Sequence, residues 1–455
     1  HQVLPEHGVV VVDEAHDLVD RVTGAATEEL TSAMVSTAAR RCGRLVDQQI
    51  AERLDEAGDG LSLLLGDATV GRWDTLGREI TGGLAAVRDA AHGCITALGS
   101  ERREEPEAAA ARRMALALLE QVHDAAQRVL GAFPGEEADR VDVVWLAEET
   151  VRGQVLRVAP LAVGGLLRQR LFGDRTVVLT SATLALGGTF DPLARQWGLP
   201  TRPLPASKPI AAPAEATASE KPPPADDGPA WTGLDAGSPF EHRRAGILYT
   251  AAHLPPPGRD GLAPSYLDEL AELVTAAGGR TLGLFSSMRA AKQATEALRS
   301  RLEVPVLCQG DDATGLLVRQ FAEDEATCLF GTLSLWQGVD VPGPSLSLVV
   351  VDRIPFPRPD DPLSSARQRA VASRGGNGFL GVAATHAALL LAQGTGRLLR
   401  STADRGVVAV LDPRLATARY GGFLRASLPP YWPTTDPEVA RAALLRLCRQ
   451  RTQES

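Results

Sequence analysis

The sequence predicts an α/β protein with two parallel-sheet domains, the first of them incomplete, and an α-helical insertion within the first domain. A run of β-branched residues, Val9–Val12, is typical of a buried strand, and a similar run, Thr176–Leu179, follows far downstream. Helical periodicity fills most of the interval between these runs. Beyond residue 240, strand and helix patterns alternate. Such alternation is typical of parallel sheets with right-handed crossovers.

Composition narrows the class of protein. The 455 residues are 44% hydrophobic and 23% charged, which is ordinary for a globular chain of several domains. The net charge of −9 argues against a uniformly basic nucleic-acid binder but leaves room for a local basic channel. No apolar run reaches the roughly 18 residues of a membrane span. The five scattered cysteines fit a reducing cytoplasm, so we expect a cytoplasmic protein with no membrane partner.

Two carboxylates follow the first predicted strand directly. The four valines Val9–Val12 predict a strand buried on both faces of a parallel sheet. Asp13 and Glu14 then fall at the carboxyl edge, where open α/β sheets bind ligands. An Asp there can hold the Mg²⁺ of a nucleoside triphosphate, and a Glu beside it can position the attacking water. An ordinary strand ending in solvated acids is the alternative.

Changes of pattern divide the chain into segments. The helical pattern ends at a predicted hairpin with strands at 141–146 and 154–158. A separate helical domain packed on itself is the simplest interpretation of the insertion. We predict these ranges: first domain 1–20 and 156–200, insertion with terminal hairpin 21–155, Pro-rich linker 201–239, and second domain 240–455.

The second domain has six predicted strands and four predicted helices. The strands are expected at 246–249, 281–285, 304–308, 327–330, 346–351 and 407–411. The helices are expected at 266–277, 290–301, 313–322 and 382–399.

Small hydroxyl residues follow the second strand of the first domain. Ser181 and Thr183 lie beyond Leu179, where their hydroxyls can bond back to Asp13 and His16 and couple nucleotide state to domain motion. By itself, the triplet Ser-Ala-Thr at 181–183 is more typical of an ordinary turn at the end of a strand.

A glycine-containing loop follows the strand at 327–330. Gly331 and Gly338 permit close backbone approach, Thr332 can hydrogen-bond a DNA phosphate, and Asp340 can reach a ribose hydroxyl or the catalytic water. A plain Gly-rich loop is an equal alternative.

Two arginines and a glutamine share one predicted helix face. Gln393, Arg397 and Arg400 are spaced i, i+4 and i+7, while the opposite face offers leucines to a core. Two guanidiniums on one stripe suit a triphosphate whose transition-state charge needs neutralising. A solvated charged face is the alternative.

In this order, the motifs resemble those of superfamily 2 helicases. Asp13 to His16 reads Asp-Glu-Ala-His, the DEAH form of the Walker B motif, and the later motifs resemble motifs III, V and VI. The insertion, together with the segments 336–343 and 354–357, resembles the DinG/XPD-type helicases, nearest the bacterial DinG-like branch. The resemblance covers nearly the whole chain except the linker.

This resemblance implies an ATP-dependent DNA helicase that moves 5′→3′ on single strands and unwinds duplexes. The processes that it implies are DNA repair or replication. It implies two RecA-like domains that clasp ATP and Mg²⁺, with residues 21–155 matching the arch domain of the family. The partners would be single-stranded and forked DNA, and the protein would act as a monomer.

The resemblance also assigns roles residue by residue. Asp13 would hold Mg²⁺ and Glu14 would activate water, while His16, Ser181 and Thr183 would couple the sites. The remaining assignments are phosphate contacts from Gln393, Arg397 and Arg400, nucleotide contacts from Gly338 and Asp340, and DNA contacts from Ser286, Ser287 and Thr332.

The chain also departs from the family pattern. Its three lysines, Lys208, Lys221 and Lys292, lie outside any Gly-x-x-x-x-Gly-Lys-Ser/Thr loop, so these 455 residues contain no Walker A element. We therefore expect the chain to be the C-terminal portion of a helicase and to hydrolyse no ATP by itself. The iron–sulfur cysteines of the family also lie upstream of the DEAH box. Gln337 and Leu333 replace a Glu and a Lys found in many relatives, which leaves DNA contact at that loop open.

Two other functions fit the same sequence. One is a nucleic-acid-binding remnant without ATPase activity, which the missing Walker A element favours for this polypeptide. The other is an ATP-driven translocase that does not separate strands.

Overall fold

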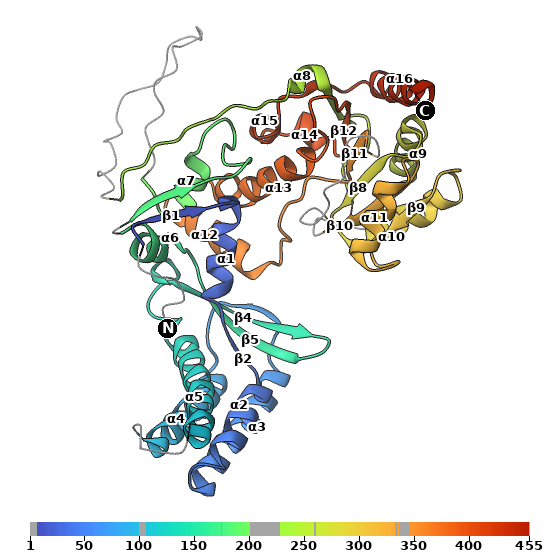
Figure 1. Ribbon diagram of the computed structural model, residues 1–455. Coiled ribbons are helices and arrows are strands. Elements are labelled where there is room, and N and C mark those ends of the chain that lie inside the picture. The colour runs from blue at the N-terminus through green and yellow to red at the C-terminus, as the bar shows by residue number, and fades with distance from the viewer. Residues whose placement is uncertain are drawn as a thin grey trace.

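The computed structural model describes seven stretches of the chain, and Figure 1 shows their arrangement. These stretches are 7–99, 106–173, 175–200, 228–258, 261–332, residue 335 and 346–454. The predicted linker lies mainly outside them, and its described part, 228–239, contains neither helix nor strand.

The C-terminal half forms a sheet of seven parallel strands in the order β13-β7-β12-β11-β8-β10-β9. The strands are β7 (Gly246–Thr250), β8 (Thr281–Phe285), β9 (Val306–Cys308), β10 (Cys328–Thr332), β11 (Leu348–Val351), β12 (Gly406–Val410) and β13 (Trp432–Thr434). Six of these strands overlap the predicted ones. The seventh, β13, was not predicted because it is three residues long and contains a proline.

Helices cover both faces of this sheet, as a buried parallel sheet requires. The helices of this half are α8 (His242–Ala245), α9 (Pro264–Ala277), α10 (Met288–Arg299), α11 (Thr314–Glu323), α12 (Pro362–Ser373), α13 (Thr385–Thr395), α14 (Arg414–Thr417), α15 (Gly421–Ala426) and α16 (Pro437–Glu454), with a π-helical segment η6 (Phe379–Ala384) before α13. Alternate residues of β11 show the two-sided burial. Val349 and Val351 join the core that contains α11 and α13, and Leu348 and Val350 join the core of α9, α10 and α16.

The first domain contributes a second parallel pair, β1 (Val9–Val12) and β6 (Thr176–Leu179), in register from Val9 opposite Thr176 to Val12 opposite Leu179. The prediction that this strand is buried on both faces was wrong. Val9 and Val11 are 61% and 65% exposed. Val178, opposite Val11 on β6, is also 48% exposed, so one face of the pair lacks cover. Within the described residues, β6 is the strand that pairs with β1.

The insertion between β1 and β6 combines helices with a small antiparallel sheet. Its helices are α1 (Leu18–Ala25), α2 (Ser32–Cys42), α3 (Gln48–Gly66), α4 (Arg78–Leu98) and α5 (Pro106–Gly131). Its sheet has the order β2-β5-β4-β3, with β2 (Glu28–Leu30), β3 (Gly71–Trp73), β4 (Asp142–Glu149) and β5 (Gly153–Pro160). Helices α2 to α5 and one face of this sheet share a separate core that contains Leu54, Leu84, Leu119 and Leu146.

The predicted hairpin is confirmed as β4 and β5, but the rest of the insertion is less purely helical than predicted. Strands β2 and β3 have three residues each, too few to show a period in the sequence. The predicted boundaries after residues 20 and 155 also fall inside α1 and β5. The strand pairing of β5 continues to Pro160, so the antiparallel sheet extends beyond the predicted end of the insertion.

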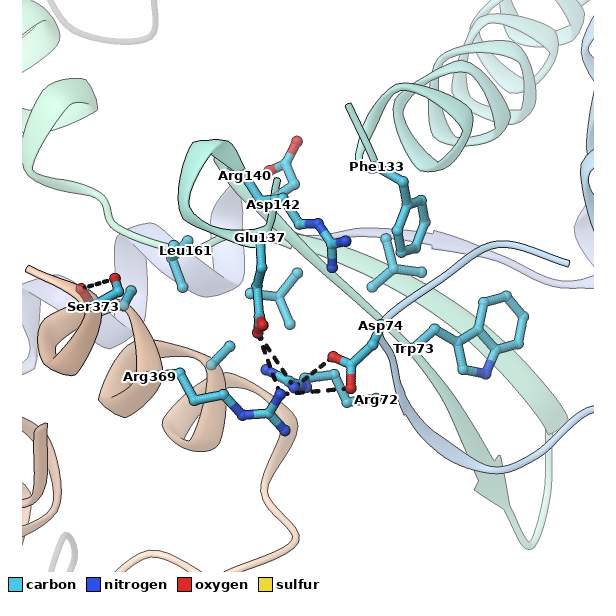
Figure 2. A pocket seen from close by; sticks show the side chains of 14 residues that line it. Arg72, Trp73, Asp74, Phe133, Glu137, Arg140, Asp142, Leu161, Arg369 and Ser373 are labelled. Atoms are coloured by element: carbon cyan, nitrogen blue, oxygen red, sulfur yellow. Dashed lines mark hydrogen bonds and ion pairs between the residues drawn. The ribbon is translucent and has the colours of Figure 1, made fainter. Parts of the chain in front are cut away.

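Helix α12 joins the insertion to the C-terminal half (Figure 2). Arg367 donates from Nε to the Leu161 carbonyl and from Nη2 to Thr23 Oγ1, both at 2.9 Å. Arg369 reaches the carboxylates of Asp74 and Glu137, at 3.5 and 3.3 Å. The insertion therefore contacts an element that follows it by more than two hundred residues in the chain.

No helix in the described part of the chain is both long enough and apolar enough to cross a membrane.

Candidate functional site

The acidic residues after β1 lie in an unusual backbone conformation. Glu14 has φ 50° and ψ 44°, the left-handed region that side chains other than glycine rarely adopt. Its N–H donates to Asp13 Oδ1 at 2.9 Å, and the next N–H, from Ala15, donates to the Thr180 carbonyl at 3.0 Å. These bonds fix both exposed carboxylates at the carboxyl edge of the β1–β6 pair, and such local strain clusters at functional sites.

A hydroxyl network connects the ends of β1 and β6. Ser181 Oγ donates to Glu14 Oε2 at 3.1 Å and lies 2.7 Å from His16 Nδ1. The Thr183 N–H donates to Ser181 Oγ at 3.3 Å. The other ring nitrogen of His16, Nε2, lies 3.2 Å from Asp17 Oδ1. Four predicted site residues, Glu14, His16, Ser181 and Thr183, are therefore in contact.

One predicted contact of this network was wrong. The sequence suggested that the hydroxyls would bond to Asp13 and His16, but the carboxylate that accepts from Ser181 is that of Glu14. The backbone explains why Glu14 and not Asp13 is the partner of Ser181. Extended backbone would place the side chains of Asp13 and Glu14 on opposite sides of the strand, whereas Glu14 has the left-handed conformation. Asp13 keeps an exposed carboxylate, which is the hard oxygen ligand that Mg²⁺ prefers.

The carboxyl edge of the seven-stranded sheet carries a second set of polar residues. After β10, Thr332 donates from its N–H and its hydroxyl to Gln309 Oε1, at 2.8 and 3.0 Å. A Cβ on Gly331 would lie 2.7 Å from Leu335, so the predicted close approach at this glycine is confirmed. Gly338 and Asp340 lie outside the described residues.

The loop after β8 contains Ser286 and Ser287. Ser286 donates from its N–H to Asp352 Oδ1 at 2.9 Å and from its hydroxyl to Asp352 Oδ2 at 2.8 Å. Ser287 is the N-cap of α10, and its Oγ accepts from the Ala290 N–H at 3.2 Å. Both residues are exposed at the sheet edge, and Ser286 is hydrogen-bonded to a buried carboxylate.

The predicted single helix with Gln393, Arg397 and Arg400 on one face is wrong. Helix α13 ends at Thr395, with Gly396 as C-cap, and both arginines lie in the following turns. Beyond the helix, buried Asp404 accepts from the Arg400 N–H at 2.7 Å and from Ser401. The turn is therefore organised around Asp404, not around a continued helix.

The core side of this segment agrees with the prediction. Leu391, Leu398 and Leu399 are all at most 3% exposed and belong to one core. Gln393 and Arg397 are partly buried and Arg400 is exposed.

A large cavity of about 1610 Å³ connects part of the first site to the C-terminal half. His16 lines it, together with Thr385, His386 and Leu389 from the first two turns of α13. This cavity links the His16 network to the start of the helix that leads to Gln393. The structure assembles the Glu14 network directly, whereas Gln393, Arg397 and Arg400 lie at the far end of α13.

Three functional candidates were missed in the sequence. Asp352 follows a run of apolar residues in the same way as Asp13, so the same signal could have found it. Gln309 and Asp404 follow no comparable pattern, because their importance depends on loops that the sequence does not define. Within the described residues, no group of three or more His, Cys, Asp or Glu side chains forms a metal cluster.

Comparisons with known proteins agree with this architecture. Residues 270–431 match the family described as "Helicase C-terminal domain". The chain is 58% identical over 451 residues to the ATP-dependent helicase DinG of Mycobacterium tuberculosis, a match that covers 98% of this chain and 64% of that protein. It is 40% identical over 205 residues to the ATP-dependent DNA helicase YoaA of Escherichia coli, covering 45% of this chain and 32% of that protein.

Solved structures show the same fold at low sequence identity. The structure of S. tokodaii Xpd4 gives a TM-score of 0.54 at 14% identity, covering 94% of this chain and 76% of that chain. A structure titled XPD_Helicase gives 0.51 at 15% identity, with 94% and 68% covered. The predicted fold class, parallel α/β sheets with an insertion, is confirmed.

A parallel β1–β6 pair and a seven-stranded parallel sheet, each with polar residues at its carboxyl edge, define a helicase-type core. The chain belongs to the DinG-type helicases, and it shares its fold with the XPD structures. It spans about two thirds of the length of the DinG relative, 64%, so the activity of the whole protein is a separate question.

Proposed function

We propose that this chain is part of an ATP-dependent DNA helicase that moves 5′→3′ on single strands and unwinds duplexes in DNA repair or replication. The observation that carries the proposal is the contact of Ser181 with both Glu14 and His16 at the carboxyl edge of β1 and β6. The name of the Mycobacterium tuberculosis relative, an ATP-dependent helicase, supports it. The scattered cysteines make the cytoplasm the proposed location.

The first step of the mechanism is positioning of the hydrolytic water. Asp13, with its exposed carboxylate, would hold the Mg²⁺ of ATP, which neutralises charge on the phosphates. Glu14 accepts the water proton through the carboxylate that Ser181 holds at 3.1 Å. Because Ser181 also contacts His16, a change at Glu14 alters the bonding of His16 as well. This shared hydroxyl couples the acid to the helix α1 that follows His16.

The second step involves the C-terminal half. Gln393, Arg397 and Arg400 meet the triphosphate across the domain interface, where guanidiniums stabilise charge that develops in the transition state. Gly338 and Asp340 contact the nucleotide beside them. These placements follow from the sequence motifs, and closure of the two domains would bring the turn after α13 toward Glu14.

Single-stranded and forked DNA are the proposed substrates, with Ser287 as a backbone contact at the carboxyl edge of the second sheet. Thr332 is the weaker candidate contact, because its N–H and its hydroxyl both donate to Gln309 Oε1. The net charge of −9 leaves only a local groove for the phosphates. Binding should prefer single strands and weaken steeply with salt, because phosphate contacts release counterions.

Strand-displacement assays test this function in a protein extended upstream through a Walker A loop. Duplexes with a 5′ single-stranded tail should be unwound in the presence of ATP, whereas 3′-tailed duplexes should remain intact. Equal unwinding of both substrates would contradict the polarity. DNA-stimulated ATP hydrolysis without strand separation would instead favour the translocase.

The 455-residue chain alone should release no phosphate above background with single-stranded DNA present. The reason is that phosphoryl transfer in this class needs a backbone nest and a lysine around the phosphates, and none of Lys208, Lys221 and Lys292 lies in such a loop. Release at the rate of the extended protein would overturn this part of the proposal. DNA binding without any hydrolysis by the extended protein would favour the non-hydrolysing remnant.

A further inference from the structure

Asp352 is a buried carboxylate at the carboxyl end of the central strand β11. It is 2% exposed, and its N–H donates to the Leu284 carbonyl at 3.0 Å, which continues the pairing of β11 with β8. Its two carboxylate oxygens accept the N–H and the hydroxyl of Ser286, at 2.9 and 2.8 Å. A single side chain thus ties the end of β11 to the loop that follows β8.

The surroundings of Asp352 compensate its charge only in part. Among the described residues, the cation in contact is Arg353, whose Nε lies 3.2 Å from Asp352 Oδ2 and whose Nη1 also donates to the Gly258 carbonyl. From α9, Tyr266 faces the same region, and its buried hydroxyl has no hydrogen-bond partner among the described residues. Burial raises the pKa of Asp352 to about 6, despite Arg353 and the Ser286 bonds that oppose this shift. A carboxylate at this position therefore opposes folding at neutral pH, and such groups often serve function.

The two bonds from Ser286 change its predicted role. Its N–H and its only hydroxyl hydrogen both point to Asp352, so Ser286 has no donor left for a DNA phosphate. Ser287 is exposed, as Ser286 is, but its Oγ acts only as an acceptor in the N-cap bond from Ala290. The hydroxyl hydrogen of Ser287 is not used by that bond and can be donated outward.

We propose that Asp352 is a positioning residue that fixes Ser286 through two hydrogen bonds, so that the β8–α10 loop presents the Ser287 hydroxyl to a phosphate of single-stranded DNA. This inference rests on the proposed function, since it concerns the DNA contact named there. Ser286 is then a second positioning residue and Ser287 is the contact.

The matched control is Asp412, a second buried carboxylate at the same sheet edge. It follows β12, is fully buried, and accepts from the Ile354 N–H at 3.0 Å and from Arg414 at 2.7 Å. Asp412 holds a different loop, since its hydrogen bonds in the described part of the chain go to Ile354 and Arg414 and not to Ser286 or Ser287. Changing either aspartate to asparagine keeps the shape and removes the charge.

The experiment measures binding of a fluorescein-labelled oligothymidylate to the 455-residue chain by anisotropy, for wild type, Asp352→Asn, Ser286→Ala, their double variant, Ser287→Ala and Asp412→Asn. Asp352→Asn should weaken binding about tenfold at pH 7.5, since a charge-assisted hydrogen bond is lost. The double variant should bind no more weakly than Asp352→Asn, because both changes break one contact. Asp412→Asn should stay within about twofold of wild type.

Two readouts separate positioning from general destabilisation. The melting temperature of Asp352→Asn should not fall, while hydrogen exchange at residues 286–289 should accelerate. The affinity advantage of wild type over Asp352→Asn should disappear as the pH falls through about 6, where Asp352 becomes neutral. Neither result is expected from a purely structural role.

Three outcomes would overturn the inference. If the wild type binds the oligonucleotide and Asp352→Asn binds it equally well, Asp352 has no part in the DNA contact. The proposed function would not be affected by that result. If Asp352→Asn has a lowered melting temperature and Asp412→Asn loses as much binding as Asp352→Asn does, the effect is structural. Absence of single-strand binding by wild type would overturn both this inference and the DNA contact in the proposed function.

Discussion

Arg369 of α12 and Glu137 of the insertion face each other at 3.3 Å, although they lie in different parts of the fold (Figure 2). Arg369 and Glu137 line a pocket that Arg72 and Asp74 also line. The Arg72 side chain is only 10% exposed and lies 2.5 Å from Asp74 and 3.7 Å from Glu137. Arg369 also reaches Asp74 at 3.5 Å. Two guanidiniums and two carboxylates thus tie the insertion to the C-terminal half.

Arg369→Glu should loosen this join with little loss of global stability. Arg369, Glu137 and Asp74 are each more than half exposed, so each pair contributes at most about 1 kcal/mol. Hydrogen exchange at β3 and at 137–139 should accelerate in Arg369→Glu, and added salt should produce a similar change in wild type. Arg374→Glu, just beyond α12, is the matched control and should leave exchange in these segments unchanged. Unchanged exchange in Arg369→Glu would show that packing alone holds the join.

Ser181→Ala should slow ATP hydrolysis by about tenfold in a protein extended upstream through a Walker A loop, with ATP binding retained. The reason is that Ser181 holds the Glu14 carboxylate and contacts His16, whose side chain is 8% exposed. Loss of the hydroxyl removes its bond to His16 Nδ1, which keeps Glu14 Oε2 at 3.2 Å, so the loss should be about 1 kcal/mol. Single-turnover hydrolysis and equilibrium binding of a labelled nucleotide measure the two effects. A parallel loss of nucleotide affinity would place Ser181 in ground-state binding instead.

The pH dependence of stability should identify Asp352. Its pKa in the folded protein, about 6, lies above the ordinary value of 3.8. A raised pKa means that its favourable contribution is fully present below about pH 4 and is lost as the pH rises through about 6. The stability of Asp352→Asn relative to wild type should therefore increase between pH 4 and 7, by at most about 3 kcal/mol. Thermal unfolding across this range measures the difference, and a constant offset would contradict the raised pKa.

Arg400→Ala should slow hydrolysis on the order of 10³-fold in the extended protein, as loss of an arginine finger does. Its backbone N–H bond to Asp404 does not depend on the side chain, so the turn should persist. Arg405→Ala, in the same segment, is the control and should retain most of the activity. Normal DNA-stimulated phosphate release by Arg400→Ala would remove Arg400 from the nucleotide site.

The sequence predicted the elements that have a clear period and missed those that depend on tertiary contacts. Strand β8 was predicted at its observed bounds, because the run Thr281–Phe285 is mostly apolar and lies between polar residues. The end of α13 at Thr395 was missed, because the leucines beyond it keep helical spacing while Asp404 organises a turn. Strands β2 and β3 were missed because each exists only through pairing with the hairpin.

The same limit applies to the candidate site. The contact of His16 with Ser181 was predictable, since adjacent parallel strands bring their carboxyl ends together. The choice of Glu14 over Asp13 as the partner of Ser181 depends on the left-handed backbone at Glu14, which no pattern of side chains indicates. The hydrogen bonds that fix Ser286 likewise depend on a carboxylate that is distant in sequence.

The most direct test of the central claim, that the Glu14 network is an ATP-hydrolysing site, is phosphate release by the protein extended upstream through a Walker A loop, with excess single-stranded DNA. Glu14→Gln should lower turnover by at least about 10²-fold while ATP binding stays near wild type, because the water-positioning carboxylate is lost and Asp13 remains. Glu52→Gln, on α3, should behave as wild type. Wild-type turnover by Glu14→Gln would contradict the account.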